Sequence, residues 1–150
     1  MNKIFVEISI GELLDKISIL EIKKIKIKDS EKLKFINGEY QVLKDGLDKN
    51  VKSDEKLEKL FQSLKETKKS NIKLTKDLEN LIIQLKEINL KLWDFEDKTR
   101  ICEKNKDFGQ TFIDLSRSVY LNNDKRANIK SKINKILGSN IKEIKQYVNY

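Results

Sequence analysis

The sequence of 150 residues is long enough for one domain with a packed core and barely long enough for two. It has no proline, five glycines and no histidine, and it carries a net charge of +8. The scarcity of helix-breaking residues predicts a mostly helical chain, and the absence of histidine excludes the usual catalytic triads and most zinc sites. Because Cys102 is the one cysteine, an intrachain disulfide and a cysteine cage for a metal are excluded too. We therefore expect a single helical domain, residues 1–150, without a metal or another cofactor.

The positive charge is carried almost entirely by lysine, since only Arg100, Arg117 and Arg126 of the 32 basic residues are arginine. A surface of lysine and glutamate keeps a protein soluble and attracts anions weakly, but it does not identify a ligand. Nucleic acid is the partner that we favour least, because lysine alone gives salt-sensitive, non-specific affinity. No apolar run approaches the roughly 20 residues that cross a membrane. We expect no membrane span, and a cytoplasmic location, since disulfide pairs are missing.

The first part of the sequence predicts an extended arm and two helices. Residues 1–8 alternate weakly between apolar and polar types and have no partner strand, so we expect them to form the arm. Ser9 is a good helix N-cap and Glu12, three residues later, completes a capping box, so a helix should run from there to about Lys28. Asp29 should cap a second helix that ends in a polar turn before residue 54.

Residues 54–105 carry the clearest pattern in the sequence, a seven-residue repeat of apolar side chains. Neither glycine nor proline interrupts it, and only polar residues near 67–71 weaken it. A repeat of this length predicts a coiled-coil-like seam. We favour one continuous, bent helix, and residues 67–71 are where it would break. The apolar positions are Leu57, Leu60, Leu64, Leu74, Leu78, Leu81, Leu85, Ile88, Leu92 and Phe95, with Cys102 at the end of the series.

The last part of the sequence predicts further helices. Residues 107–109 should end the heptad helix, and the next helix should start near Gln110. The polar run 122–124 is either an N-cap cluster or a polar step within one helix. Gly138 suits the position after a helix C-terminus, and Ser139 would cap a last short helix. The expected fold is all-α, with long antiparallel helices in a helical bundle or coiled-coil-like hairpin and a short extended N-terminal arm.

All three arginines and the only tryptophan lie in two segments, 92–100 and 117–126. Since lysine is used almost everywhere else, arginine in these segments suggests a need for its planar, bidentate guanidinium group. In the structural interpretation, which we favour, Glu96 and Arg100 form an ion pair and Arg126 pairs with Asp94 or Asp97. In the functional interpretation, the arginines converge on an anionic small molecule and the carboxylates shape the site. The candidate ligand-binding residues are Trp93, Asp94, Glu96, Asp97, Arg100, Arg117, Tyr120, Asn122, Arg126 and Lys130, although Trp93 can equally be a core residue.

Short motifs at both ends and in the middle of the chain form one pattern: VEIS at 6–9, GELLDK at 11–16, ILEIK at 19–23, IN at 88–89, LWD at 92–94, ED at 96–97, RSVY at 117–120, ND at 123–124, RA at 126–127 and IK at 129–130. This pattern resembles a small bacterial and phage family whose domain has no assigned function. The resemblance implies that both ends and the middle of the chain belong to one domain, and it implies no catalytic residues.

Two functions fit these observations. The long heptad seam and the lack of a catalytic motif favour a non-enzymatic interaction or scaffold protein that acts as a homodimer. The alternative is a small-molecule-binding protein or an enzyme that recognises an anionic ligand, such as a phosphorylated or nucleotide-linked sugar, through the arginine cluster. An enzyme of this composition would depend on carboxylates, on lysine or on electrostatic stabilisation by arginine.

Overall fold

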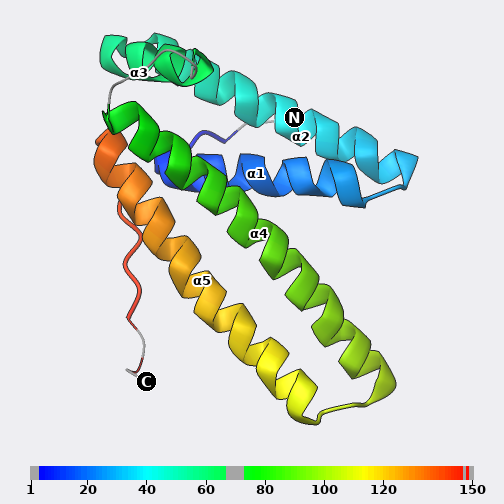
Figure 1. Ribbon diagram of the computed structural model, residues 1–150. Coiled ribbons are helices and arrows are strands. Elements are labelled where there is room, and N and C mark those ends of the chain that lie inside the picture. The colour runs from blue at the N-terminus through cyan, green and yellow to red at the C-terminus, as the bar shows by residue number, and fades with distance from the viewer. Residues whose placement is uncertain (1–3, 67–72, 147, 149–150) are drawn as a thin grey trace.

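The computed structural model describes residues 4–66, 73–146 and 148, and these residues form five α-helices and no strand (Figure 1). The helices are α1 (Ile10–Lys26), α2 (Ser30–Lys52), α3 (Glu55–Lys65), α4 (Lys73–Asn105) and α5 (Gln110–Leu137). The all-α helical bundle predicted from the sequence is thus confirmed. None of the helices in the described residues combines the length and the apolar character of a membrane-spanning segment.

Two antiparallel helix pairs build the bundle (Figure 1). α4 and α5 lie side by side along nearly their full lengths and are joined by the short connection 106–109. α1 and α2 form the other pair, and α1 packs across α4 and α5 and contacts both. The short α3 contacts α2 and α4 at one end of the bundle. This crossing of α1 over the α4–α5 pair determines where the core and the polar cluster described below are located.

The heptad positions of α4 lie at the centre of the core. Leu78, Leu85 and Ile133 are at most 1% exposed and belong to one apolar cluster. Leu57 and Leu64 of α3 pack against the same cluster. Burying one such leucine or isoleucine side chain stabilises a protein by about 1.5–3 kcal/mol. The seven-residue repeat is therefore satisfied inside one chain, and it no longer calls for a second copy.

The N-caps predicted for the first two helices are present. Ser9 Oγ accepts a hydrogen bond from the backbone N–H of Glu12 at 3.2 Å, and Asp29 Oδ1 accepts one from a backbone N–H three residues later at 3.0 Å. The second half of the predicted capping box is absent, because the Glu12 carboxylate extends to Lys130 at 2.8 Å. α5 ends at Gly138 as predicted, and the φ of 68° at this residue lies in the left-handed region that glycine adopts without a steric penalty.

The segment 54–105 contains two helices, α3 and α4, where the sequence pattern favours one. α3 ends at Lys65, and Glu66 has a non-helical backbone conformation (φ −95°, ψ 22°). α3 lies beside the end of α2, whereas α4 runs across α1 (Figure 1). The predicted breaking point, residues 67–71, lies outside the described residues.

Other helix boundaries differ from those predicted from the sequence. The polar turn predicted before residue 54 is shorter than expected, because α2 continues to Lys52, and the polar run 122–124 is a step inside α5. Residues 139–146 form no helix, so the prediction of a last short helix after Ser139 is wrong for these residues. Ile144 is 90% exposed, and a short helix without an apolar surface to cover is unstable in water.

The start of α1 is pressed against α5 at Gly11. A Cβ atom at this position would lie 2.7 Å from Asn134 Oδ1 and 2.7 Å from the backbone oxygen of Lys130. Because the backbone cannot move aside easily, we expect Gly11→Ala to lower the free energy of unfolding by about 1–3 kcal/mol, measured by urea denaturation. Gly38→Ala is the control, since nothing lies within 4 Å of its Cβ position, and it should stabilise the helix by about 0.5–1 kcal/mol. A stabilised Gly11→Ala variant would contradict the close contact.

Candidate functional site

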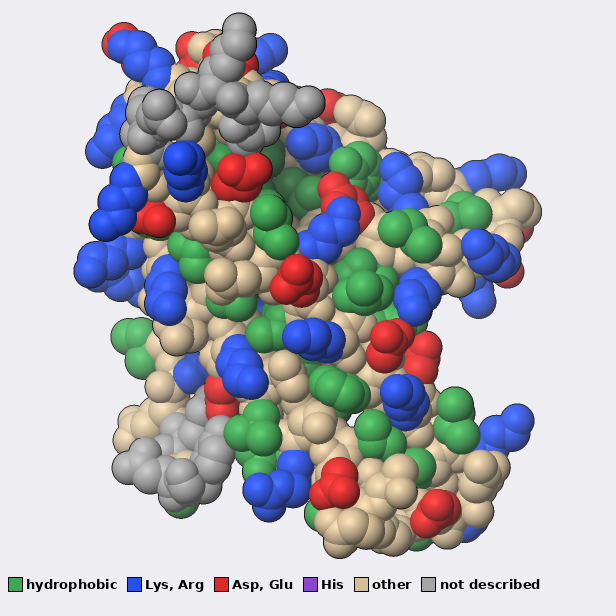
Figure 2. Space-filling view, in the orientation of Figure 1, with side chains coloured by type: hydrophobic (Ala, Val, Ile, Leu, Met, Phe, Trp, Pro, Cys, Tyr) green, Lys and Arg blue, Asp and Glu red, His purple; other side chains and the backbone are tan. Residues whose placement is uncertain are grey.

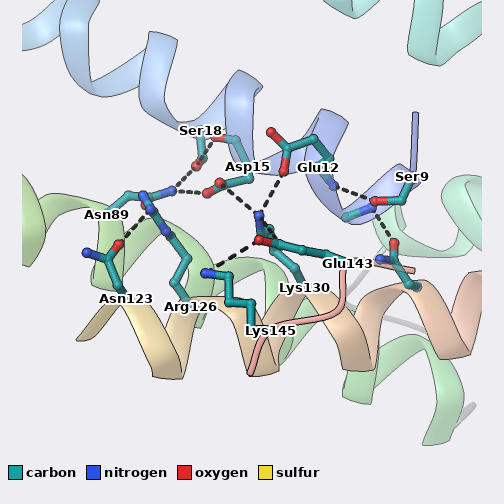
Figure 3. Close-up of polar contacts among 12 residues, drawn as sticks. Ser9, Glu12, Asp15, Ser18, Asn89, Asn123, Arg126, Lys130, Glu143 and Lys145 are labelled. Carbon is teal, nitrogen blue, oxygen red and sulfur yellow. Dashed lines mark hydrogen bonds and ion pairs between the residues drawn. The ribbon is translucent and has the colours of Figure 1, made fainter. Parts of the chain in front are cut away.

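The buried polar side chains gather where α1 crosses α4 and α5 (Figure 3). Burial of polar groups is costly unless each group has a hydrogen-bond partner. A dense cluster of such groups in a small domain therefore marks a candidate functional site. Apart from Thr75, the buried polar residues of the described chain all belong to this region, and they are Ser9, Asp15, Ser18, Asn89, Lys130 and Asn134.

Asn89 of α4 connects α1 to α5. Its amide nitrogen donates to Asp15 Oδ1 at 2.6 Å and to Ser18 Oγ at 2.7 Å, so both of its N–H groups are used. Ser18 in turn donates its hydroxyl hydrogen to the backbone oxygen of Asp15. The amide oxygen of Asn89 is left to accept a hydrogen bond from Arg126 Nη1 at 3.2 Å. Contacts from α1 thereby orient Asn89 so that it presents an oxygen atom to α5.

Lys130 is the buried cation of the same network. Its Nζ lies 2.8 Å from Glu12 Oε2, 2.9 Å from Glu143 Oε2 and 3.9 Å from Asp15 Oδ2. Burial by itself disfavours the ammonium, but the hydrogen bonds to Glu12 and Glu143 outweigh it and raise the pKa of Lys130 above its ordinary 10.5. The hydrogen bond from Lys130 lowers the pKa of Glu143 below its ordinary 4.5. Lys130 and Glu143 are therefore charged at neutral pH, and the contacts of Lys130 hold α1, α5 and the C-terminal segment together.

A cavity of about 370 Å³ opens beside Asn89 and Arg126. Its apolar wall consists of Ile19, Ile22, Leu92 and Trp93. Its polar wall consists of Asn89, Glu96, Asp97, Arg100, Asn123 and Arg126. Half of the predicted ligand-binding residues thus line one cavity, namely Trp93, Glu96, Asp97, Arg100 and Arg126. Its size and its mixture of apolar and polar walls suit a small organic molecule.

The hydrogen-bond partners of Arg126 are neutral amides, whereas Arg100 and Lys130 each bind a carboxylate. Nη1 donates to the amide oxygen of Asn89 at 3.2 Å, and Nη2 donates to that of Asn123 at 2.6 Å. None of the ion pairs among the described residues involves Arg126. Arg100 instead pairs with Glu96 at 2.6 Å and is 70% exposed. The guanidinium of Arg126 is therefore held in position by amides while its charge stays available to an anion.

The structural interpretation of the arginines is correct for one pair and wrong for the other. Glu96 and Arg100 form the predicted ion pair. Asp94 pairs at 3.0 Å with Lys26, the last residue of α1, and not with Arg126. Asp97 lines the cavity without a described ion pair to Arg126.

The remaining candidates do not line the Arg126 cavity. Arg117 and Tyr120 are exposed on α5. Asn122 donates to the backbone oxygen of Ser118 and lines a separate cavity between α4 and α5. Lys130 lines another cavity, at the end of α5. The structure therefore divides the ten predicted residues among several places on α4 and α5.

Several residues of the network were not predicted, although the sequence contains a signal for some of them. Asp15, Ser18 and Ile22 follow one another at spacings of four and three after Gly11, so they share the buried side of α1. Asn89 lies four residues after Leu85 and three before Leu92, on the buried side of α4. Polar residues on an apolar helix face indicate either a buried network or a site.

The chemistry that the cavity offers is recognition of charge and shape. A positioned guanidinium binds an oxyanion, the carboxylates of Glu96 and Asp97 accept hydrogen bonds, and the indole of Trp93 provides a flat apolar surface. No group of three or more metal-ligating side chains occurs in the part of the chain that the structure describes.

One comparison with known proteins gives a match. Residues 75–149 match the model of a family of unknown function, DUF6165. The matched segment supplies Asn89, Arg126 and Lys130 to the polar cluster, whereas Asp15 and Ser18 come from α1, outside it. No curated protein and no solved structure matches the chain significantly.

Proposed function

The chain belongs to the DUF6165 family of unknown function, and we propose that it is a small-molecule-binding protein whose Arg126 cavity holds an anionic group. The observation that carries this proposal is the pair of neutral amide oxygens that position Arg126, at 3.2 Å from Asn89 and 2.6 Å from Asn123. A partly buried cation that lacks a carboxylate partner among the described residues gains most from an incoming anion.

The rest of the cavity supports a ligand that also has hydrogen-bond donors and an apolar face. Glu96 and Asp97 are acceptors at the cavity wall, and Trp93 offers a flat surface. A phosphorylated or nucleotide-linked sugar combines these properties, because its phosphate suits Arg126, its hydroxyl groups donate to carboxylates and the C–H face of its ring packs on an indole. We propose this class of ligand. Arg100 lies at the same wall, where Glu96 neutralises its charge, so Arg126 is the group that binds the phosphate.

Substitution of Arg126 tests the proposal. We expect Arg126→Gln to weaken the binding of glucose 6-phosphate by about 10- to 100-fold, because a hydrogen bond to a charged group contributes about 1.5–3 kcal/mol. The affinity of Arg126→Lys for glucose 6-phosphate should lie between those of the wild type and Arg126→Gln, since lysine keeps the charge but lacks the planar, bidentate guanidinium group. Isothermal titration calorimetry measures the affinity, and a thermal-shift panel of phosphorylated and nucleotide-linked sugars identifies a tighter ligand for the same comparison.

Arg117→Gln is the matched control, because it removes the same charge from an exposed position of the same helix. It should leave the affinity unchanged within a factor of about two. If Arg117→Gln and Arg126→Gln lost equal amounts of affinity, the binding would be a non-specific attraction of the anion to a basic protein. If no compound of the panel binds, the proposal is wrong.

A second candidate function, a scaffold that acts as a homodimer, is favoured by one face of α2. Phe35 is 79% exposed and Val42 is 70% exposed, and they lie seven residues apart on the same side of the helix. Gly38 and Gly46 on this side have nothing within 4 Å of their Cβ positions, so another helix can approach closely. We propose the α2 helix of a second copy, related by a two-fold axis, as the partner.

Light scattering coupled to size-exclusion chromatography tests this second candidate. A dimeric mass for the wild type and a monomeric mass for Phe35→Glu, with unchanged circular dichroism, would support it. A monomeric wild type at concentrations of tens of micromolar would exclude it.

A further inference from the structure

The segment after α5, residues 139–146, which we call the strap, lies against the end of α5 and runs back along it (Figure 1). Polar contacts hold it in place. Glu143 binds Lys130 at 2.9 Å, and the backbone N–H of Ser139 donates to the backbone oxygen of Asn134 at 2.9 Å. Ile144 is 90% exposed, so burial of apolar surface contributes little at this position. A segment with so few contacts belongs to the part of a protein that opens most easily.

A cavity of about 430 Å³ lies between the strap, the last turns of α5 and Ser9 at the start of α1. Three ammonium groups line it, those of Lys130, Lys135 and Lys142, against the single carboxylate of Glu143. Neither Lys135 nor Lys142 takes part in an ion pair among the described residues. The lining therefore has a surplus of positive charge. In Figure 2, Lys and Arg side chains gather over the region where α5 ends and α4 begins.

Lys130 gives this cavity a cation that is fixed in place. It is 8% exposed, and Glu12 and Asp15 of α1 hold its ammonium from the side opposite the strap (Figure 3). Glu143 of the strap occupies the remaining position at Nζ, at 2.9 Å. A carboxylate supplied by the strap thus lies where an oxyanion from solution would bind.

We propose that this cavity is a second ligand site, for a compact dianion such as phosphate or the phosphate group of a metabolite. Lys130, Lys135 and Lys142 bind the anion, Glu143 competes with it for Lys130, and the strap closes over it. Gly138 provides the pivot, because its left-handed conformation lets the chain reverse direction directly after α5. The site is independent of the Arg126 cavity, since the two cavities share no lining residue.

Calorimetric titration of the full chain with inorganic phosphate tests the proposal. The double variant Lys135→Gln/Lys142→Gln should lose at least about tenfold in affinity. The control, Lys125→Gln/Lys132→Gln, removes the same charge from exposed positions of α5 that do not line the cavity, and it should change the affinity less than about threefold. Glu143→Gln should tighten binding by about three- to tenfold, because it removes the competing carboxylate.

The variants distinguish phosphate binding at the strap cavity from binding at the Arg126 cavity and from diffuse attraction by surface lysines. The component of binding that depends on Lys135 and Lys142 should persist in Arg126→Gln, so failure at the Arg126 cavity does not affect this inference. Equal losses in the two double variants would mean diffuse attraction by surface lysines and would overturn the site. No phosphate binding by Glu143→Gln at millimolar concentration would overturn it too. Bound phosphate should slow amide hydrogen exchange in residues 139–146, and unchanged exchange in the presence of binding would overturn the closing role of the strap.

Discussion

Replacing Lys130 by methionine should lower the free energy of unfolding by about 3–5 kcal/mol, the cost expected when a buried ion pair loses one partner. Methionine keeps much of the length of the side chain, so the loss is chiefly electrostatic. Glu12 loses a hydrogen bond of 2.8 Å, and the buried carboxylate of Asp15 loses a cation at 3.9 Å. Urea denaturation followed by circular dichroism at pH 7 measures the effect.

Lys132→Met is the matched control, because Lys132 is exposed on the same helix. It should change the free energy of unfolding by no more than about 0.5 kcal/mol. If Lys130→Met lowered the free energy of unfolding by less than about 1 kcal/mol, water would solvate Glu12 and Asp15 in the native protein. The buried network would then contribute little to stability.

Asn89→Leu should be the second most damaging of the substitutions considered, with a loss of about 3 kcal/mol, since it leaves a buried carboxylate without its amide donor. Leucine has the same branching and the same number of side-chain heavy atoms as asparagine, but it removes the hydrogen bonds of 2.6 Å to Asp15 and 2.7 Å to Ser18. It also removes the acceptor that holds Arg126 Nη1. We therefore expect weaker binding of the sugar phosphate in addition to lower stability, and both are measured on the same variant by denaturation and calorimetry.

Asn80→Leu is the matched control for Asn89→Leu, because it makes the same substitution in α4 outside the buried network. Asn80 is exposed on the same helix, and its substitution should alter stability by less than about 0.5 kcal/mol and leave binding unchanged. If Asn89→Leu were as stable as the wild type, apolar packing would compensate fully for the lost hydrogen bonds. If it also bound the sugar phosphate as tightly as the wild type, Asn89 would not be the residue that orients Arg126.

The sequence predicts part of the candidate site for a simple geometric reason. Trp93, Glu96, Asp97 and Arg100 lie within about two turns of one helix, so any cavity beside this stretch of α4 includes several of them. The same local reasoning fails for Asp94, which lies in the same stretch but pairs with Lys26 of α1. Which side of α4 faces the cavity depends on where α1 crosses it.

The sequence by itself determined the features that depend on residues a few positions apart. Ser9 and Asp29 cap their helices through hydrogen bonds to backbone groups three residues later, and the apolar repeat of α4 follows from the helical period. Only the tertiary structure decided which residues meet in the polar cluster. Arg126 meets Asn89 across 37 positions of sequence, Asn89 meets Asp15 across 74 and Lys130 meets Glu12 across 118. Such contacts depend on the crossing of packed helices, which the interlocking of many side chains establishes and no short sequence pattern encodes.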